Sequence, residues 1–274
     1  MRLSQRVLRI LFRLSRFWLH YGNPLTVLYK RHLVKEGMMT AIDRASGIAC
    51  ACRISSFQMF GEVWYNRDYD VPHFPIRPGD VVVDIGANQG FFACYAAHHQ
   101  AKVYAFEPFP ESLQTLKANL ERNGLGDRVI AEPWAIGARE GTVKLFYGND
   151  IGGGMNTTQP DFVQITQMDC QGNLEVPCYT LPQVIEKFGL ERIRLCKLDC
   201  EGSELDILKQ LGPEQLRRID AFVLEYHPGY ELADLMQLLL SWGTHQVSFA
   251  EDNDHYPRHV IRLVATQELM TNLS

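Results

Sequence analysis

A nearly unbroken run of apolar, β-branched residues at 81–85 constrains this chain more than any other feature. Such a run is typical of a strand that is buried on both faces of a sheet. A glycine-containing turn and a helical pattern over 91–98 follow, and strands and helices then alternate along the chain. The alternation predicts an α/β domain with a doubly wound, mainly parallel sheet that carries helices on both faces.

The remaining predicted elements continue this pattern to the end of the chain. They are strands at 102–107, 129–135, 142–147, 194–198 and 221–225, helices at 112–122, 181–188, 203–211 and 231–242, and a C-terminal antiparallel pair of strands at 246–249 and 259–265. Ligands of parallel sheets bind at the carboxyl ends of the strands, where strand order reverses. Residues that follow these strands are therefore the candidates for a functional site.

The 274 residues divide into three regions of different character. Residues 1–22 are predicted to form a basic amphipathic helix, residues 23–77 a small linking subdomain or substrate cap, and residues 78–274 the ligand-binding domain. Pro78-Gly79 and the prolines before it mark the last boundary. Within the cap, strands are expected at 40–43 and 48–53. Its aromatic-rich stretch from Phe57 to Tyr69 either packs against the main domain or lines a substrate pocket.

The N-terminal arm carries five arginines at spacings of four and three residues, which places them on one stripe of a helix. They are Arg2, Arg6, Arg9, Arg13 and Arg16. Three interpretations of residues 1–20 remain open. The arm docks on its own domain or on a second copy in a homodimer, it lies on an anionic membrane surface, or it is a mitochondrial transit peptide. Arginine interrupts every turn, so a secretory signal is excluded.

Charge and composition exclude several functional classes. The net charge is −5, and residues 1–35 hold eight basic residues and no acidic one, so the body of the chain is strongly acidic. A nucleic-acid partner is therefore not expected. No run of about 18 apolar residues is available to span a bilayer. The seven cysteines form no C-x-x-C pair, which favours reduced thiols and a cytoplasmic location, with membrane association through the N-terminal helix as the variant.

The turn after the first strand indicates a cofactor. It reads Asp84-Ile-Gly86-Ala87-Asn88-Gln-Gly90, which differs from the G-x-G-x-x-G of dinucleotide sites. An acidic residue before the first glycine suits a cationic ligand with an amino-acid tail, and S-adenosylmethionine fits that description. Glu107 ends the second strand, 17 residues after Gly90, where a carboxylate can accept hydrogen bonds from ribose hydroxyls. Together these residues indicate an adenosine-type cofactor.

At this point the sequence resembles the FkbM-type class I methyltransferases. The resemblance rests on the Asp84 turn, on Ala105-Phe-Glu-Pro108 with Asn119 and Asn123 after it, on Ala135-Ile-Gly137, on Cys196-Lys-Leu-Asp-Cys-Glu-Gly-Ser-Glu204, and on Leu224-Glu-Tyr-His227. It covers residues 78–230 well and the first 60 residues hardly at all. It implies a Rossmann-like, seven-stranded sheet and a domain that binds S-adenosylmethionine for methyl transfer.

The resemblance also implies roles for individual residues. Asp84, Gly86, Asn88 and Gly90 would hold the methionine end of the cofactor, with Ala87 in the same turn. The ribose would lie at Glu107 and Pro108, and the adenine near Trp134 and Ala135. Asp199 would face the amino group or the transferred methyl.

A hydroxyl acceptor must also lose a proton, so a base is expected near it. The candidates are His227, Asp199, Glu201 and Glu225, and the ordinary pKa of histidine suits this work near neutral pH. Glu204 is assigned to the first turn of a helix. Asp199 and Glu201 could hold magnesium, but no cluster of His and Cys supports zinc, and no metal is assigned.

The favoured function is S-adenosylmethionine-dependent O-methylation of a hydroxyl on a sugar, a glycan or a secondary metabolite. Carboxyl or N-methylation on the same scaffold is the alternative among enzymes. A catalytically silent cofactor-binding module that acts through its amphipathic arm is the alternative from another class. A nicotinamide dehydrogenase is disfavoured because the central glycine is missing. The glycine-rich loop at 150–158 is either a lid over the acceptor or a hairpin tip.

Overall fold

Seven strands form the central sheet of this protein, whose computed structural model describes residues 18–29, 34, 37–71, 74–148, 156–243, 245–249 and 261–267. They are β3 (Val81–Ile85), β4 (Lys102–Phe106), β5 (Val129–Glu132), β9 (Leu195–Leu198), β10 (Ala221–Tyr226), β11 (His245–Phe249) and β12 (Ile261–Gln267). The strand order is β11-β12-β10-β9-β3-β4-β5, and the five strands from β10 to β5 run parallel. β12 runs antiparallel to β10 and β11. The predicted fold class, with its C-terminal antiparallel pair, is therefore confirmed.

The order of the strands reverses between β3 and β9, which are neighbours in the sheet although they are far apart in the sequence. β4 and β5 extend the sheet on one side of this point, and β10 extends it on the other. At such a reversal the chain leaves the two strands toward opposite faces, which opens a crevice at their carboxyl ends.

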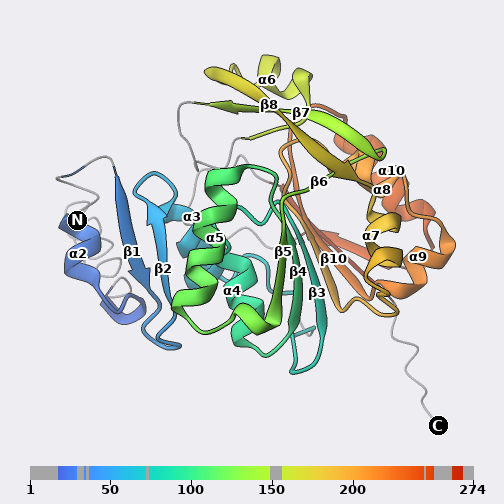
Figure 1. Ribbon diagram of the computed structural model, residues 1–274. Helices are drawn as coiled ribbons and strands as arrows, with labels where there is room; N and C mark the ends of the chain where they lie inside the picture. The colour runs from blue at the N-terminus through green and yellow to red at the C-terminus, as the bar shows by residue number, and fades with distance from the viewer. Residues whose placement is uncertain are drawn as a thin grey trace, which may run out of the picture.

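Helices cover both faces of the sheet (Figure 1). One face carries α4 (Phe91–His98) and α5 (Pro110–Arg122), and the other carries α7 (Leu181–Lys187), α8 (Glu204–Leu208), α9 (Pro213–Arg218) and α10 (Leu232–Ser241). Neighbouring residues of a strand point to opposite faces, so Val82 joins the core under α4 while Val83 joins the core under α7. A strand buried in this way needs an apolar side chain at almost every position, which explains the run at 81–85.

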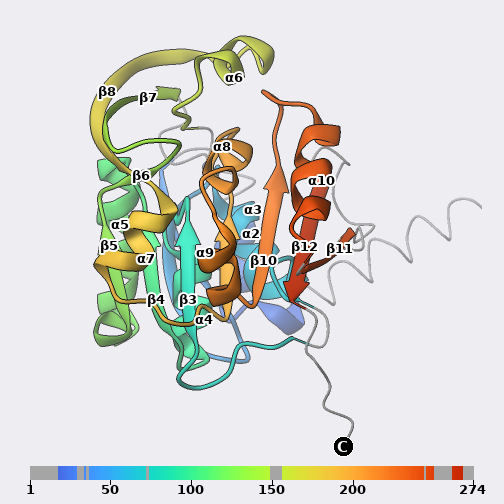
Figure 2. The same ribbon diagram turned by 90° about the vertical axis from the view of Figure 1, so that its right-hand side faces the viewer.

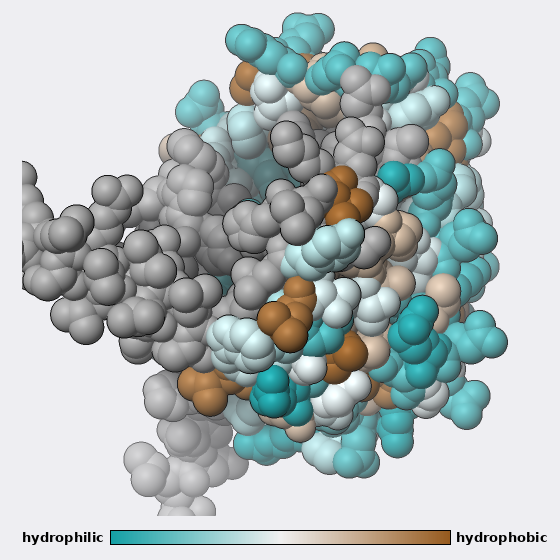
Figure 3. Space-filling view, turned by 90° about the vertical axis from the view of Figure 1, so that its left-hand side faces the viewer, coloured by the Kyte–Doolittle hydropathy of each residue, from teal (hydrophilic) through white to brown (hydrophobic). Residues whose placement is uncertain are grey.

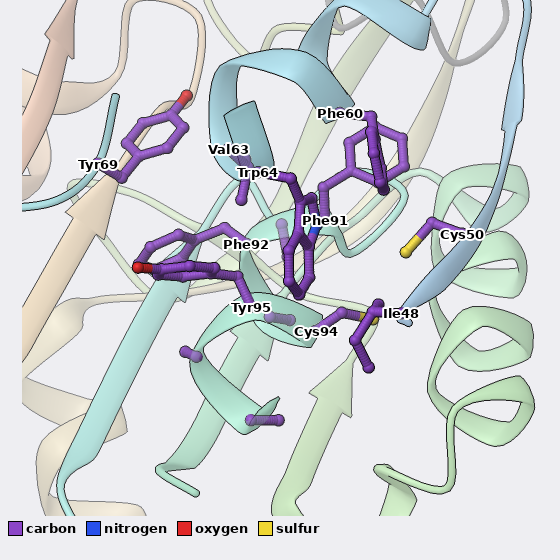
Figure 4. Packing of buried hydrophobic residues seen from close by; sticks show 14 of the residues in the cluster. Ile48, Cys50, Phe60, Val63, Trp64, Tyr69, Phe91, Phe92, Cys94 and Tyr95 are labelled. Carbon is purple, nitrogen blue, oxygen red and sulfur yellow. The ribbon is translucent and has the colours of Figure 1, made fainter. Parts of the chain in front are cut away.

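The segment before the central sheet packs on its α4 and α5 face. It contains α2 (Pro24–Tyr29), β1 (Met38–Ile42), β2 (Ala49–Arg53), α3 (Phe57–Gly61) and the π-helix η2 (Glu62–Asn66). β1 and β2 form the expected antiparallel pair. Phe60 packs against Phe91 at 5.8 Å between ring centroids, and Trp64 packs against Tyr95 at 5.4 Å (Figure 4). The buried core thus continues across the predicted boundary at residue 78, and the boundary itself stays a prediction.

Asn119 of α5 and Asn123, the residue that caps the end of this helix, bind the free edge of β2. Asn119 accepts a hydrogen bond from the Ala51 amide at 2.7 Å and donates one to the Ala51 carbonyl at 2.9 Å. Asn123 does the same for Ala49, with both distances 2.9 Å. These side-chain amides replace the third strand that the edge of β2 lacks, because each supplies one donor and one acceptor as a backbone would.

A second sheet lies beyond the carboxyl ends of the parallel strands (Figure 2). It has the order β6-β8-β7, formed by β6 (Ala135–Ile136), β7 (Gly141–Gly148) and β8 (Cys170–Tyr179), and α6 (Pro160–Ile165) lies beside it. The single strand predicted at 129–135 is therefore wrong. β5 ends at Glu132, because Pro133 has no N–H group with which to continue the ladder, and Ala135 pairs in the second sheet instead. β8, α6 and α9 were not predicted from the sequence.

Two predictions fall largely outside the described residues. The arginine stripe of residues 1–17 lies outside them, and so do residues 149–155 of the glycine-rich loop. Leu25 and Tyr29 of α2 and Met38 of β1 are exposed, and Figure 3 shows hydrophobic residues scattered on the face that includes them. No helix in the described ranges has the length and apolar character needed to cross a membrane.

Replacing Asn119 should destabilise the fold more than an ordinary change on α5. We expect Asn119→Ala to lower the free energy of unfolding by about 2–4 kcal/mol, because backbone groups of Ala51 and Gln89 lose their partners. Gln114→Ala, on the exposed side of the same helix, should change it by less than about 0.5 kcal/mol. Urea unfolding of both variants measures the difference, and similar values for the two would contradict the role assigned to the amide.

Candidate active site

A cavity of about 510 Å³ opens at the carboxyl ends of β3, β4, β9 and β10, where the strand order reverses. The segment before the sheet supplies part of its wall through Met59, Glu62 and Tyr69, and the region around β6 and β7 supplies another part. Nearly all the predicted site residues line it: Gly86, Ala87, Asn88, Glu107, Pro108, Trp134, Ala135, Asp199, Glu201, Glu225 and His227. Asp84 and Gly90 do not.

Gly86 allows the two central strands to meet at the cavity floor. Its φ is +73°, and a Cβ atom at this position would lie 1.8 Å from the carbonyl oxygen of Asp199. No side chain fits such a contact, so a glycine is required for close backbone approach as well as for the turn. Two residues later, Asn88 also has a positive φ, and its buried Oδ1 atom has no hydrogen-bond partner among the described residues.

Glu107 holds the turn in place from the end of β4. Its carboxylate accepts hydrogen bonds from the backbone amides of Asn88 and Phe109, both at 2.8 Å. The residue is 6% exposed, and burial raises the pKa of its carboxyl to about 7. Beside it, Phe106 and Trp134 stack at 5.9 Å and give this end of the cavity an aromatic wall.

Asp84 takes a different position from the one expected. The sequence places it beside the methionine end of a ligand, but the side chain is fully buried behind the cavity, where Lys197 Nζ lies 3.2 Å from its Oδ1. Burial alone would lower the pKa of Lys197, but Asp84 and Asp199 raise it above its ordinary value, so the amine is charged. The same Nζ donates to the Gly86 carbonyl at 3.1 Å and lies 3.4 Å from Asp199 Oδ2. Asp84 therefore acts through Lys197 and does not reach the cavity.

Gly90 likewise does not reach the cavity. It is the N-cap residue of α4 and has a φ of +82°, and a Cβ atom there would lie 2.7 Å from Leu116 Cγ of α5. The absence of a side chain serves close packing of two helices, which is the physical reason for a glycine at this position.

His227 lies at the polar end of the cavity between three carboxylates. Its Nδ1 atom is hydrogen-bonded to Glu204 at 2.8 Å, and its Nε2 atom lies 3.7 Å from both Asp199 Oδ1 and Glu201 Oε2. Burial opposes the charged ring, but Glu201 and Glu204 together raise the pKa of His227 well above its ordinary value. The ring is then protonated at neutral pH and cannot accept a proton. The reason for assigning it as the base, its ordinary pKa, is therefore wrong.

Glu201 and Glu204 are three residues apart, but Glu201 lines the cavity whereas Glu204 is buried beneath it. Glu201 lines the cavity from a left-handed backbone position (φ +54°), and burial raises its pKa to about 8. Glu204 is fully buried, and besides His227 it accepts hydrogen bonds from the Cys200 and Gly202 amides and from the Tyr230 hydroxyl. Glu204 lies in the first turn of α8 as predicted, and it also orients His227, which was not predicted.

Tyr69 is a site residue that the sequence analysis did not single out. Its hydroxyl lies 3.0 Å from Asp199 Oδ2 and 2.9 Å from Glu225 Oε1, and Lys197 Nζ lies 5.1 Å from its ring centre. One phenolic hydrogen can serve only one of the two carboxylates at a time, so the hydroxyl couples Asp199 to Glu225. The signal that could have found Tyr69 is its place in the aromatic stretch proposed as a pocket wall.

Removing the buried ammonium should cost more stability than removing an exposed one. We expect Lys197→Met to lower the free energy of unfolding by about 3–5 kcal/mol, because Asp84 would remain buried without its counter-charge. Lys209→Met removes the same group from an exposed position and should cost less than about 0.5 kcal/mol. The double variant Asp84→Asn/Lys197→Met should recover part of the loss in urea unfolding. A loss that is unchanged in the double variant would mean that the pair is not the cause.

Comparison with known proteins agrees with this geometry. The model of the methyltransferase FkbM domain matches residues 84–245, which is more than half of the chain. The methyltransferase sdnD of Sordaria araneosa is 29% identical over 67% of this chain and 79% of its own length. The 31-O-demethyl-FK506 methyltransferase FkbM of Streptomyces tacrolimicus is 28% identical over 62% of this chain and 74% of its own length. The hexuronic acid methyltransferase AglP of Haloferax volcanii is 25% identical over 72% of this chain and 79% of its own length. The strands and turns that build the cavity lie almost wholly within the matched residues, and the chain belongs to the FkbM methyltransferase family.

Proposed function

We propose that this protein transfers a methyl group from S-adenosylmethionine to a hydroxyl oxygen of a sugar, a glycan or a secondary metabolite. Its family supports methyl transfer. The observation that carries the finer proposal is the division of one cavity into two ends. Glu107 and an aromatic wall lie at one end, and several proton-accepting carboxylates lie at the other.

The cofactor end fits an adenosine with an amino-acid tail. The outer lone pairs of the Glu107 carboxylate suit ribose hydroxyls, since its other interactions are already made with two backbone amides. The aromatic wall suits an adenine ring. The buried Asn88 Oδ1 atom, which has no described partner, suits the ammonium group of the tail. When bound, S-adenosylmethionine supplies a methyl group that its sulfonium has already activated.

The other residues of the cavity prepare the acceptor. Phe91, Phe92 and Val63 line the cavity and limit the entry of water, and Asp199 and Glu201 orient an acceptor hydroxyl by accepting its hydrogen bonds. A hydroxyl must give up its proton during transfer, whereas a carboxylate acceptor need not. The concentration of proton-accepting groups at this end therefore favours a hydroxyl acceptor over a carboxylate.

The pKa of Glu107 predicts how cofactor binding depends on pH. Only the ionised carboxylate accepts hydrogen bonds from both ribose hydroxyls, and with a pKa of about 7 it is about one tenth ionised at pH 6 and about nine tenths ionised at pH 8. We expect the affinity for adenosine, which has no tail to titrate, to rise roughly eight- to tenfold over this range in calorimetry.

Two variants serve as controls for this titration. Glu107→Gln should bind adenosine weakly and equally at both pH values. Glu111→Gln, which removes an exposed carboxylate from α5, should keep the wild-type dependence. An affinity that does not change with pH in the unmodified protein would contradict the assignment of Glu107 to the ribose.

The chemistry of the product distinguishes the acceptor classes. A panel of sugars, uronic acids, amines and hydroxylated metabolites is incubated with S-adenosylmethionine and searched by mass spectrometry for products that are one methyl group heavier. We expect a methyl ether, which survives mild alkali. A product that alkali hydrolyses is a methyl ester and would replace the hydroxyl proposal by carboxyl methylation, and a methylated amine would replace it by N-methylation.

A further inference from the structure

We propose that Asp199, Glu201 and His227 bind a divalent cation of the Mg²⁺ or Mn²⁺ type at the acceptor end of the cavity. From the sequence, Asp199 and Glu201 were possible magnesium ligands, and no metal was assigned. The fold adds His227, because β9 and β10 are parallel neighbours and the residues that follow them meet at the same edge. One ligand atom from each of the three side chains lies within 4.8 Å of the other two.

The separations within the group suit an ion better than a hydrogen bond. His227 Nε2 lies 3.7 Å from Asp199 Oδ1 and from Glu201 Oε2, which is too long for a hydrogen bond to either. Ligand atoms that share one small cation at about 2.1 Å stand up to roughly 4.2 Å apart. The two separations from His227 Nε2 are therefore of the size that one such ion bridges.

The orientation of His227 is the independent observation that points to a ligand. The residue is only 8% exposed, and Nε2 faces the two carboxylates without a hydrogen bond to either. Glu204 holds Nδ1 at 2.8 Å, so the ring cannot rotate to give Nε2 another partner. A carboxylate that fixes the far nitrogen is the usual support of a metal-binding histidine, since it sets the tautomer and raises the basicity of the other nitrogen. A cation at Nε2 would take the place of the proton that the ring otherwise carries there.

Glu204 is itself fixed from three further directions. It accepts hydrogen bonds from the amides of Cys200 and Gly202 and from the Tyr230 hydroxyl. Its position therefore does not depend on whether an ion is bound at His227. The support for the histidine is built into the fold.

The charge balance of this end also favours a cation. Lys197 and His227 are the basic side chains that pair with the carboxylates here, within the described part of the chain. The carboxylates outnumber them, and they are Asp84, Asp199, Glu201, Glu204 and Glu225. Buried charge without compensation is costly, and a divalent ion that displaces the proton of His227 would bring one further positive charge to this end.

The cation gives the predicted catalytic residues separate tasks, an assignment that rests on the proposed function. An acceptor oxygen on the ion has a lowered pKa. Three of the four predicted catalytic residues become ligands, and Glu225, which Tyr69 hydrogen-bonds at 2.9 Å, receives the hydroxyl proton. The acceptor oxygen then forms its bond to the methyl carbon while the carbon–sulfur bond breaks and leaves its electron pair on sulfur.

Manganese binding tests the site without any acceptor. The full chain is titrated with Mn²⁺ and followed by electron paramagnetic resonance and calorimetry, and we expect one bound ion per chain that millimolar Mg²⁺ displaces. Asp199→Asn and Glu201→Gln should each weaken Mn²⁺ binding at least about 100-fold. Glu204→Gln should weaken it about 10- to 100-fold through the histidine. Glu62→Gln removes a carboxylate from the same cavity outside the proposed ligand set and should change it less than about twofold.

Binding of S-adenosylhomocysteine to the same samples separates the failures. A variant that binds this compound is folded, so loss of Mn²⁺ in that variant is a specific effect. The cation site would be overturned if the unmodified protein bound S-adenosylhomocysteine but failed to bind Mn²⁺. It would also be overturned if Glu201→Gln bound Mn²⁺ as tightly as the unmodified protein. Either result would leave the proposed function standing. Mn²⁺ binding without S-adenosylhomocysteine would support the site and overturn the proposed function. Displacement by Zn²⁺ but not by Mg²⁺ would overturn the choice of ion.

Discussion

One buried ammonium group joins the two strands between which the sheet reverses its order. Lys197 Nζ of β9 contacts Asp84 of β3, the carbonyl of Gly86 after β3, and Asp199 after its own strand. A charge with only 3% exposure is costly unless several oxygens surround it, so these contacts must form together. They hold the turn of Gly86 against the carbonyl of Asp199, and this close approach sets the floor of the cavity. The two ends of the site are thus positioned by the same interaction.

The fold was predictable where hydrophobic periodicity and breakers agree. The strand at 81–85 and the helix at 91–98 lie where the sequence predicted them, because an apolar run and a glycine turn leave few alternatives. β8 was missed because its solvent-facing positions carry Gln, Asn and Glu, and its Pro177 argues against a strand. It exists because β7 pairs with it over most of its length, which is a long-range contact that no local pattern contains.

The site was predictable at the level of which turns meet, but not at the level of which side chains face the ligand. The residues after β3, β4, β9 and β10 meet because parallel strands place their carboxyl ends at one edge. Asp84 still lies within β3, where it pairs with Lys197 of β9, so its side chain does not reach that edge. It forms an ion pair with Lys197 instead. The protonation of His227 follows from Glu201 and Glu204, which come from another strand end, so its pKa is a property of the assembled site.

The cavity is lined both by residues that match the family model and by residues that precede the match. The family match begins at residue 84, but Met59, Glu62 and Tyr69 line the cavity from the preceding segment, and Tyr69 touches both Asp199 and Glu225. Most of the cofactor end is built from matched residues, although Met59 contacts Asn88 there. The acceptor end combines matched carboxylates with Tyr69 from outside the match. Substrate discrimination depends on the walls that contact the acceptor. We therefore expect relatives that share the Glu107 end to differ in their acceptors, in step with changes at positions equivalent to 55–69.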